Sequence, residues 1–150
     1  MQKLIQNQAE LIEAVQYIAS ETSRLAQKII GSILPIKSLT IFSHSEAEYE
    51  VLVKILGEIG KVYSFHNGPR AELNVPIMIG NNQITHLRIR QPDIERPQVG
   101  CNDFETNYEN FKKEYLHKCP NNLRVIARPE YEMIELFDPE FNVLAYVVSK

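Results

Sequence analysis

The 150-residue sequence has no tryptophan and only two cysteines, Cys101 and Cys119, and neither belongs to a CxxC pair. So few cysteines exclude a disulfide-stapled scaffold and are typical of a reducing cytoplasm, where we expect the protein to work. No run of about 18 apolar residues is present to span a bilayer. The amino terminus also lacks the basic region and apolar block of a signal peptide. We therefore expect no membrane association.

Neither sign of charge is in large excess. The chain has 16 Lys and Arg against 19 Asp and Glu, a net charge of −3, which offers no general attraction for nucleic acid or anionic lipid. A glycine-rich motif that could cradle a phosphate is also missing. The 44% of hydrophobic and 23% of charged residues are typical of a folded globular chain, either one domain or two small modules sharing a core.

A long amphipathic helix is predicted near the start of the chain, over about residues 3–30, and Gly31 and Pro35 mark its end. Its apolar stripe recurs at three- and four-residue steps: Leu4, Leu11, Val15, Ile18, Leu25 and Ile29. Two interpretations remain open for this extension, residues 1–35. The helix either packs against the domain, which the two polar interruptions of the stripe favour, or pairs with a second copy to form a homodimer.

The rest of the chain repeats one pattern twice. Ser45–Glu48 and Thr106–Glu109 both have the spacing of a capping box, in which the hydroxyl and the Glu side chain bond to backbone N–H groups at a helix start. The boxes lie about sixty residues apart, each preceded by one predicted strand and followed by a helix and three strands. The predicted fold is α+β: two tandem βαβββ modules, about residues 36–92 and 97–149, in a single domain of residues 36–150.

The last two predicted strands, Met133–Phe137 and Asn142–Val148, form a hairpin around Asp138-Pro139. A turn centred on Glu140 would place Glu135 opposite Ala145. Ile134 and Leu136 would then share the core face with three residues of the final strand, namely Leu144, Tyr146 and Val148. A slip of one residue would exchange the two faces.

A tandem βαβββ pair ending in FDPEFNVLAYV resembles the vicinal oxygen chelate superfamily, which includes glyoxalase I and extradiol dioxygenases. Modules of that superfamily typically end in a strand, a DPDGN-type turn and a strand. Asp138, Pro139 and Asn142 match this turn, whereas Phe141 stands where glycine is usual. The resemblance covers about residues 36–149, and the added helix is similar to the YecM-like branch of small bacterial members. It implies a cupped mixed sheet with a divalent metal held by His, Gln or Glu.

The metal site that the resemblance implies is incomplete in this sequence. The superfamily takes its ligands from the first and last strand of each module, but Ala145 stands where a Glu is usual and neither opening strand has a His. Only His86, Gln98 and Glu135 remain as donors, and neighbouring arginines would repel a cation. We therefore predict no metal and no other cofactor.

The segment ITHLRIR, residues 84–90, has the clearest pattern of functional side chains. Alternation places His86, Arg88 and Arg90 on one face together with Ile84, and leaves Leu87 and Ile89 to pack beneath the helices. Two guanidinium groups beside an imidazole suit a carboxylate or phosphate. The alternative is a solvated face on which these cations pair with acidic residues such as Glu95, Asp103 or Glu135.

The remaining candidates lie in the second module. Glu135 and His86 are the candidate catalytic residues. Glu135, among apolar neighbours, could act as a general base, or could instead form an ion pair with Arg88 or Arg90. Gln98 and Cys101, on the opening strand, complete the predicted ligand-binding set. Cys101 could be a nucleophile, although such a cysteine is more often a small core residue.

These observations favour a metal-free protein that binds a small anionic metabolite. The alternative is a metal-dependent lyase, isomerase or oxygenase acting on a small oxyanionic substrate, with Glu135 as acid or base. A third hypothesis is an interaction protein that associates with itself through the amino-terminal helix.

Overall fold

The computed structural model describes residues 4–150. Three helices occur over this range, α1 (Gln8–Ile30), α2 (Glu46–Ile59) and α3 (Tyr108–Tyr115), together with one eight-stranded sheet. The strands are β1 (Ile36–Phe42), β2 (Gly60–Ser64), β3 (Arg70–Ile79), β4 (Asn82–Arg90), β5 (Gly100–Phe104), β6 (Leu123–Ala127), β7 (Glu132–Leu136) and β8 (Val143–Val148). The order strand, helix, three strands occurs twice after α1, which confirms the predicted α+β fold.

The two modules lie side by side in one mixed sheet of order β2-β3-β4-β1-β5-β8-β7-β6. Within the modules, β1 pairs in parallel with β4 and β5 in parallel with β8, whereas β1 and β5 pair antiparallel and join the two halves. The first and last strands of both modules therefore form the centre of the sheet. Strands β2 and β6 are its edges.

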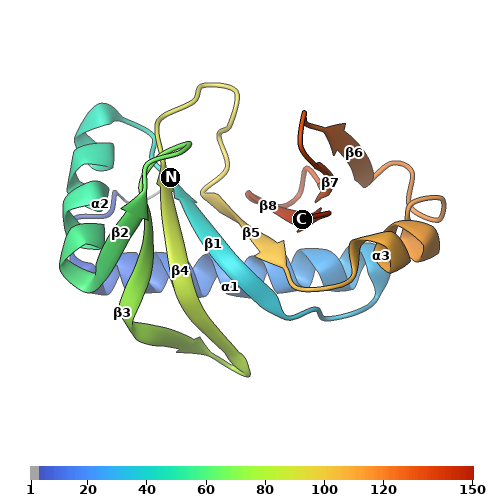
Figure 1. The fold of residues 1–150 in the computed structure, drawn as a ribbon, viewed down its shortest axis with the longest axis horizontal. Coiled ribbons are helices and arrows are strands. Elements are labelled where there is room, and N and C mark those ends of the chain that lie inside the picture. The colour runs from blue at the N-terminus through green and yellow to red at the C-terminus, as the bar shows by residue number, and fades with distance from the viewer. Residues whose placement is uncertain (1–3) are drawn as a thin grey trace.

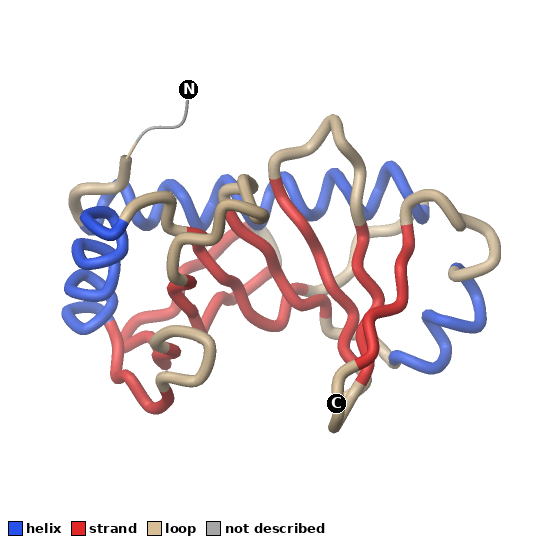
Figure 2. The backbone as a smooth tube through the Cα atoms, turned by 90° about the horizontal axis from the view of Figure 1, so that it is seen from above, coloured by secondary structure: helices blue, strands red, loops and turns tan. Residues whose placement is uncertain are grey.

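Helix α1 lies along one side of this sheet and spans both modules (Figures 1 and 2). The side chain of Asn7 caps its first turn by accepting a hydrogen bond from the backbone N–H of Glu10, and Gly31 ends it with a φ of 70°. Its apolar stripe is completely buried against the sheet at Leu11, Val15 and Leu25. The stripe is thus used for packing within the domain. Neither α1 nor any other helix in residues 4–150 is long and apolar enough to cross a membrane.

The two faces of the sheet differ in character. The face toward α1 and α2 is apolar and carries the main core, including Leu39, Ile41, Leu87 and Ile89. The opposite face, which we call the helix-free face, carries a smaller cluster of Phe42, Cys101, Leu144 and Tyr146. Polar and charged side chains surround that cluster, so the helix-free face is the surface to search for function.

The final hairpin has a register one residue away from the predicted one. Glu135 lies opposite Tyr146, and Leu136 lies opposite Ala145, so the turn is centred between Glu140 and Phe141. The turn is fixed by Asp138, whose carbonyl oxygen accepts from the Phe141 N–H and whose side chain accepts from the Glu140 N–H.

This shift exchanges the faces of β8, as a one-residue slip must. The prediction that Leu144, Tyr146 and Val148 belong to the main core is wrong, because all three lie in or against the cluster on the helix-free face. Their neighbours, Val143, Ala145 and Val147, are completely buried in the main core instead.

The second capping box also differs from the prediction. The residue that caps α3 is Asn107, whose side-chain oxygen accepts from the N–H of Asn110, whereas Thr106 lies one residue before the cap. In the first module the predicted cap is confirmed, since the Ser45 hydroxyl accepts from the Glu48 N–H. Asn is a better cap than Thr, which accounts for Asn107 capping α3 in place of its neighbour Thr106.

Candidate functional site

A row of side chains crosses the four central strands on the helix-free face. Arg88 of β4 lies opposite Thr40 of β1, Thr40 opposite Cys101 of β5, and Cys101 opposite Leu144 of β8. Arg70 of β3 extends the row beyond Arg88. Because directly paired residues point to the same side of a sheet, two guanidinium groups come together at one end of this row.

The alternation predicted for β4 holds for most of the strand. Leu87 and Ile89 are buried in the main core, and Arg88 and Arg90 lie on the opposite face. Ile84, predicted to share the arginine face, belongs to the core instead. The pairing of β3 with β4 shifts between Glu72 and Ile77, and such an irregularity changes which side chains share a face.

Arg88 is half-buried and has no counter-ion among residues 4–150. Within residues 4–150 no carboxylate lies at ion-pair distance from its guanidinium, and its Nε is buried without a hydrogen-bond partner. The charge of Arg88 acts on the nearby carboxyl of Asp103. Burial raises the pKa of Asp103, and the positive charge of Arg88 opposes this rise. Arg88 is therefore a fixed positive charge with unused donors.

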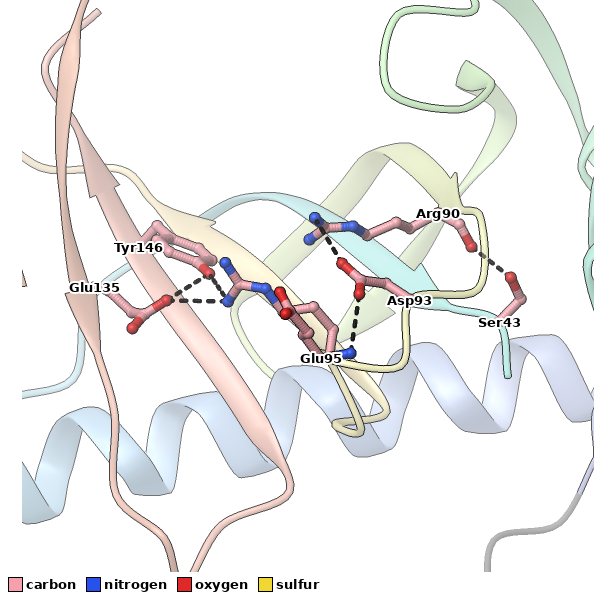
Figure 3. Close-up of polar contacts among 7 residues, drawn as sticks. Ser43, Arg90, Asp93, Glu95, Glu135 and Tyr146 are labelled. Carbon is pink, nitrogen blue, oxygen red and sulfur yellow. Dashed lines mark hydrogen bonds and ion pairs between the residues drawn. The ribbon is translucent and has the colours of Figure 1, made fainter. Parts of the chain in front are cut away.

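Arg90 lies at the end of the same strand and is already engaged. Its guanidinium is 3.8 Å from a carboxylate oxygen of Asp93 (Figure 3). It also stacks over the ring of Phe42 at 5.3 Å. Its backbone carbonyl oxygen accepts a hydrogen bond from the Ser43 hydroxyl, which anchors the end of β4. Arg90 thus contributes charge at the margin of the row.

Cys101 lies in the middle of the row and is 4% exposed. Burial raises the pKa of its thiol to about 11, so the side chain is a neutral thiol at neutral pH. A thiolate is needed for nucleophilic attack. The environment of Cys101 therefore suits a packed floor of the site and gives no support to a nucleophilic role.

His86 and Glu135, the two candidate catalytic residues, are not brought together by the fold. His86 faces the edge of the sheet, where its Nε2 is 3.7 Å from Glu72 and its ring meets Tyr63 edge-on. Strands β1, β5 and β8 separate its strand from β7, which carries Glu135. A shared acid–base step would require hydrogen-bond reach, which this separation denies.

Glu135 is instead the centre of a buried polar network. It is 4% exposed and accepts from Arg124 Nη2 at 3.0 Å and from Arg96 Nη1 at 3.3 Å. It also accepts from the Tyr146 hydroxyl at 2.8 Å (Figure 3). The expected ion pair with Arg88 or Arg90 is absent from residues 4–150, and Arg96 and Arg124 take that place. Both carboxylate oxygens are engaged, so Glu135 is not positioned as a free general base.

A cavity of about 380 Å³ lies beside this network. It is lined by Arg96, Gln98, Pro120, Asn121, Asn122, Leu123, Arg124, Glu135, Phe137 and Leu144. Two of the predicted site residues, Gln98 and Glu135, therefore meet in one cavity. The side-chain Oε1 of Gln98 is itself buried without a hydrogen-bond donor, and the backbone carbonyl of Gln98 accepts from His44 Nε2 at 2.8 Å.

The residues present do not fit a divalent metal. Within residues 4–150 no three side chains of His, Cys, Asp or Glu come close enough together to hold an ion. The row on the first and last strands of the modules offers one thiol, one hydroxyl, one guanidinium and one leucine, whereas a metal needs three or four convergent donors.

Sequence reasoning missed Arg96, Arg124 and Tyr146. Arg124 could have been found, because β6 and β7 form a hairpin in which it lies directly opposite Glu135, and opposite charges commonly pair across strands. Tyr146 was missed through the register error. Arg96 lies in the connection between the modules, and no local pattern indicates where such a loop places its side chains.

No protein-family model matches the chain, and no curated protein matches it in sequence. A solved structure described as protein EC4020, from structural genomics, has a similar fold, with a TM-score of 0.68 at 14% sequence identity. The similarity covers 99% of this chain and 94% of that chain, so it includes α1 as well as both modules. At this level of identity the likeness concerns the fold alone.

Proposed function

We propose that the helix-free face binds a small anionic metabolite without a metal, with Arg88 as the principal contact. The observation that carries this proposal is the half-buried guanidinium of Arg88, which has no carboxylate partner among residues 4–150 and a buried, unbonded Nε. Buried donors without acceptors are costly. A ligand carboxylate or phosphate would supply the acceptors that the protein does not.

The neighbours of Arg88 strengthen the attraction for an anion. Arg70 lies directly beside it across the β3–β4 pair, and Arg90 follows two residues later on the same face. Neither Thr40 nor Cys101, which continue the row, carries charge at neutral pH. A polyanion would thus meet several guanidinium groups above a small, uncharged floor, in a geometry that suits paired hydrogen bonds.

The resemblance to the vicinal oxygen chelate superfamily gives this arrangement a rationale. In that superfamily the first and last strands of each module hold a metal, which binds substrate oxygens. Here the corresponding strands are the four central ones, and one of them carries Arg88. A guanidinium can hold the same kind of oxyanion as a metal ion, but it is a poor Lewis acid. This favours binding over the lyase, isomerase or oxygenase alternative.

The proposal is tested by calorimetric titration with inorganic phosphate and with malonate. We expect Arg88→Ala to weaken binding by about 10- to 100-fold, the value of one or two charge-assisted hydrogen bonds. Arg88→Lys should recover only part of the loss, because an ammonium lacks the planar fork. The matched control is Arg24→Ala, an exposed arginine of α1 on the other side of the sheet, and it should bind like the wild type.

Two results would contradict the proposal. Equal affinities for Arg88→Ala and Arg24→Ala would show that the anion binds elsewhere or nowhere specific. A stoichiometric divalent metal in the purified protein that is lost in His86→Ala would restore the metal-dependent alternative.

A further inference from the structure

The cavity beside Glu135 lies at the end of the row opposite to Arg88 and shares only Leu144 with that row. It is bounded by the connection before β5, by the segment that leads into β6 and by the end of β7. Arg88, Arg90 and Cys101 do not line it. Its volume of about 380 Å³ falls within the range of small-molecule sites. The affinity of a ligand bound in this cavity should therefore not depend on the charge of Arg88.

The cavity carries an excess of positive charge. Two guanidinium groups, those of Arg96 and Arg124, face one carboxylate, that of Glu135. Each arginine uses a single terminal nitrogen for protein contacts, Nη1 in Arg96 and Nη2 in Arg124. Their other side-chain N–H groups donate to no acceptor within residues 4–150. Two sets of donors thus remain for an anion, on either side of a carboxylate that holds both arginines in place.

The rest of the lining indicates what the anion would be attached to. Leu123, Phe137 and Leu144 give an apolar wall that would accept a hydrocarbon group. Gln98 adds an amide whose Oε1 has no donor. The terminal torsion of a glutamine side chain is broad, so rotation can present this oxygen to the cavity. A ligand hydroxyl would then supply the hydrogen bond that Oε1 lacks.

We propose that this cavity is a second, independent binding site for a small hydroxy carboxylate with an apolar body. Arg96 and Arg124 hold the carboxylate, Gln98 accepts from the hydroxyl, and the wall of Leu123, Phe137 and Leu144 packs against the hydrocarbon part. Glu135 positions the arginines and does not touch the ligand. Its charge opposes that of the bound carboxylate, so it lowers the affinity while it maintains the geometry.

The test uses two ligands that differ by one hydroxyl group, mandelate and phenylacetate, titrated calorimetrically into the full chain. We expect mandelate to bind about tenfold more tightly, the worth of one buried hydrogen bond. Gln98→Leu, which keeps the bulk of the side chain, should remove this preference and leave phenylacetate unchanged. Inorganic phosphate, which has no apolar part, should compete poorly.

Two further variants separate the roles of the charges. Arg124→Ala should weaken both ligands by about tenfold or more, and the fold should tolerate it because that side chain is 67% exposed. Glu135→Gln should strengthen both ligands by about threefold or more, since it removes the like charge. A general base or a ligand-binding carboxylate would not give an increase.

Arg88→Ala is the control that distinguishes this site from the proposed function, and it should leave mandelate binding unchanged. Loss of mandelate binding in Arg88→Ala would place the ligand on the Arg88 row and overturn the second site. Equal affinities of the wild type for mandelate and phenylacetate, no binding of either, or an unaltered affinity in Arg124→Ala would overturn it as well. If Arg124→Ala fails to fold, Arg124→Lys gives the same test, because it keeps the charge but loses the fork.

Discussion

Replacement of Glu135 gives the sharpest test of the buried network, because its three partners differ in how well water can hydrate them once the carboxylate is removed. Its carboxylate is 4% exposed and accepts three hydrogen bonds, two of them from guanidinium groups. Glu135→Ala removes these bonds and leaves Arg96, whose side chain is 24% exposed, without its counter-ion. Charged hydrogen bonds are worth about 1.5–3 kcal/mol each, but arginines that can hydrate recover part of this.

We expect Glu135→Ala to lower the free energy of unfolding by about 2–4 kcal/mol, from the same principles. For a chain of this length, that corresponds to a fall in Tm of about 6–12 °C. Arg124→Ala should cost only about 0–1 kcal/mol, because its side chain is 67% exposed and surface ion pairs contribute little. Arg96→Ala should lie between these values. Tyr146→Phe should cost about 1 kcal/mol for one lost hydrogen bond.

The measurement is urea unfolding of the four variants, followed by circular dichroism and compared with thermal scans. The reasoning depends on the order Glu135→Ala, Arg96→Ala, Arg124→Ala, from most to least destabilising. If Arg124→Ala cost as much as Glu135→Ala, the exposure argument would be refuted. If Glu135→Ala were neutral, the network would contribute nothing to stability.

Three further predictions concern other parts of the fold. Burial raises the pKa of Asp103 above its usual 3.8, so the stability that this carboxyl contributes is fully present below that value and is lost as the pH rises through the folded-state pKa. Asp103→Asn should therefore be more stable than the wild type at neutral pH. If the difference in stability between the variant and the wild type were the same at pH 3 and pH 7, this reasoning would be contradicted. Gly68 has a φ of 96°, and an added Cβ would overlap the carbonyl oxygen of Ile89, whereas Gly80 has a φ of 58° and open space around it. In urea unfolding, Gly68→Ala should therefore lower the stability by about 3 kcal/mol or more and Gly80→Ala by about 1 kcal/mol. Equal losses of stability in the two variants would refute the overlap. Deletion of residues 1–32, which include α1, should abolish cooperative unfolding rather than turn a dimer into a monomer, because the helix forms part of the main core. If circular dichroism showed that the truncated chain still folds and unfolds cooperatively, α1 would not be an essential part of that core.

Local sequence was sufficient for the succession of elements. The three- and four-residue spacing from Leu11 to Leu25 predicts an amphipathic helix, and Ser45 with Glu48 predicts the start of α2, because both patterns depend on contacts within a few residues. The alternation in β4 likewise predicts that Leu87 and Ile89 face the core and that Arg88 faces away from it. The order of one strand, one helix and three strands recurs in the second half of the sequence, and this repeat predicted the duplicated α+β fold.

Register and loop paths were decided by the tertiary structure. The final strand, Val143–Val148, is apolar on both faces, so periodicity cannot distinguish pairing of Glu135 with Ala145 from pairing with Tyr146. The turn around Asp138 settles the register. The distance between His86 and Glu135 was likewise decided by the fold, since the strand order places three strands between β4 and β7.

In the candidate site, too, part of the arrangement was predictable from the sequence and part was decided by the tertiary structure. The sequence correctly placed Arg88 on the face opposite the core, because strand alternation is a local property. It did not identify the partners of Glu135, because Arg96 comes from the connection between modules and Arg124 from a neighbouring strand. Whether a buried carboxylate is a free base or the centre of an ion-pair network depends on which charges the fold brings within about 4 Å, the range over which an ion pair acts. Only the tertiary structure could decide that.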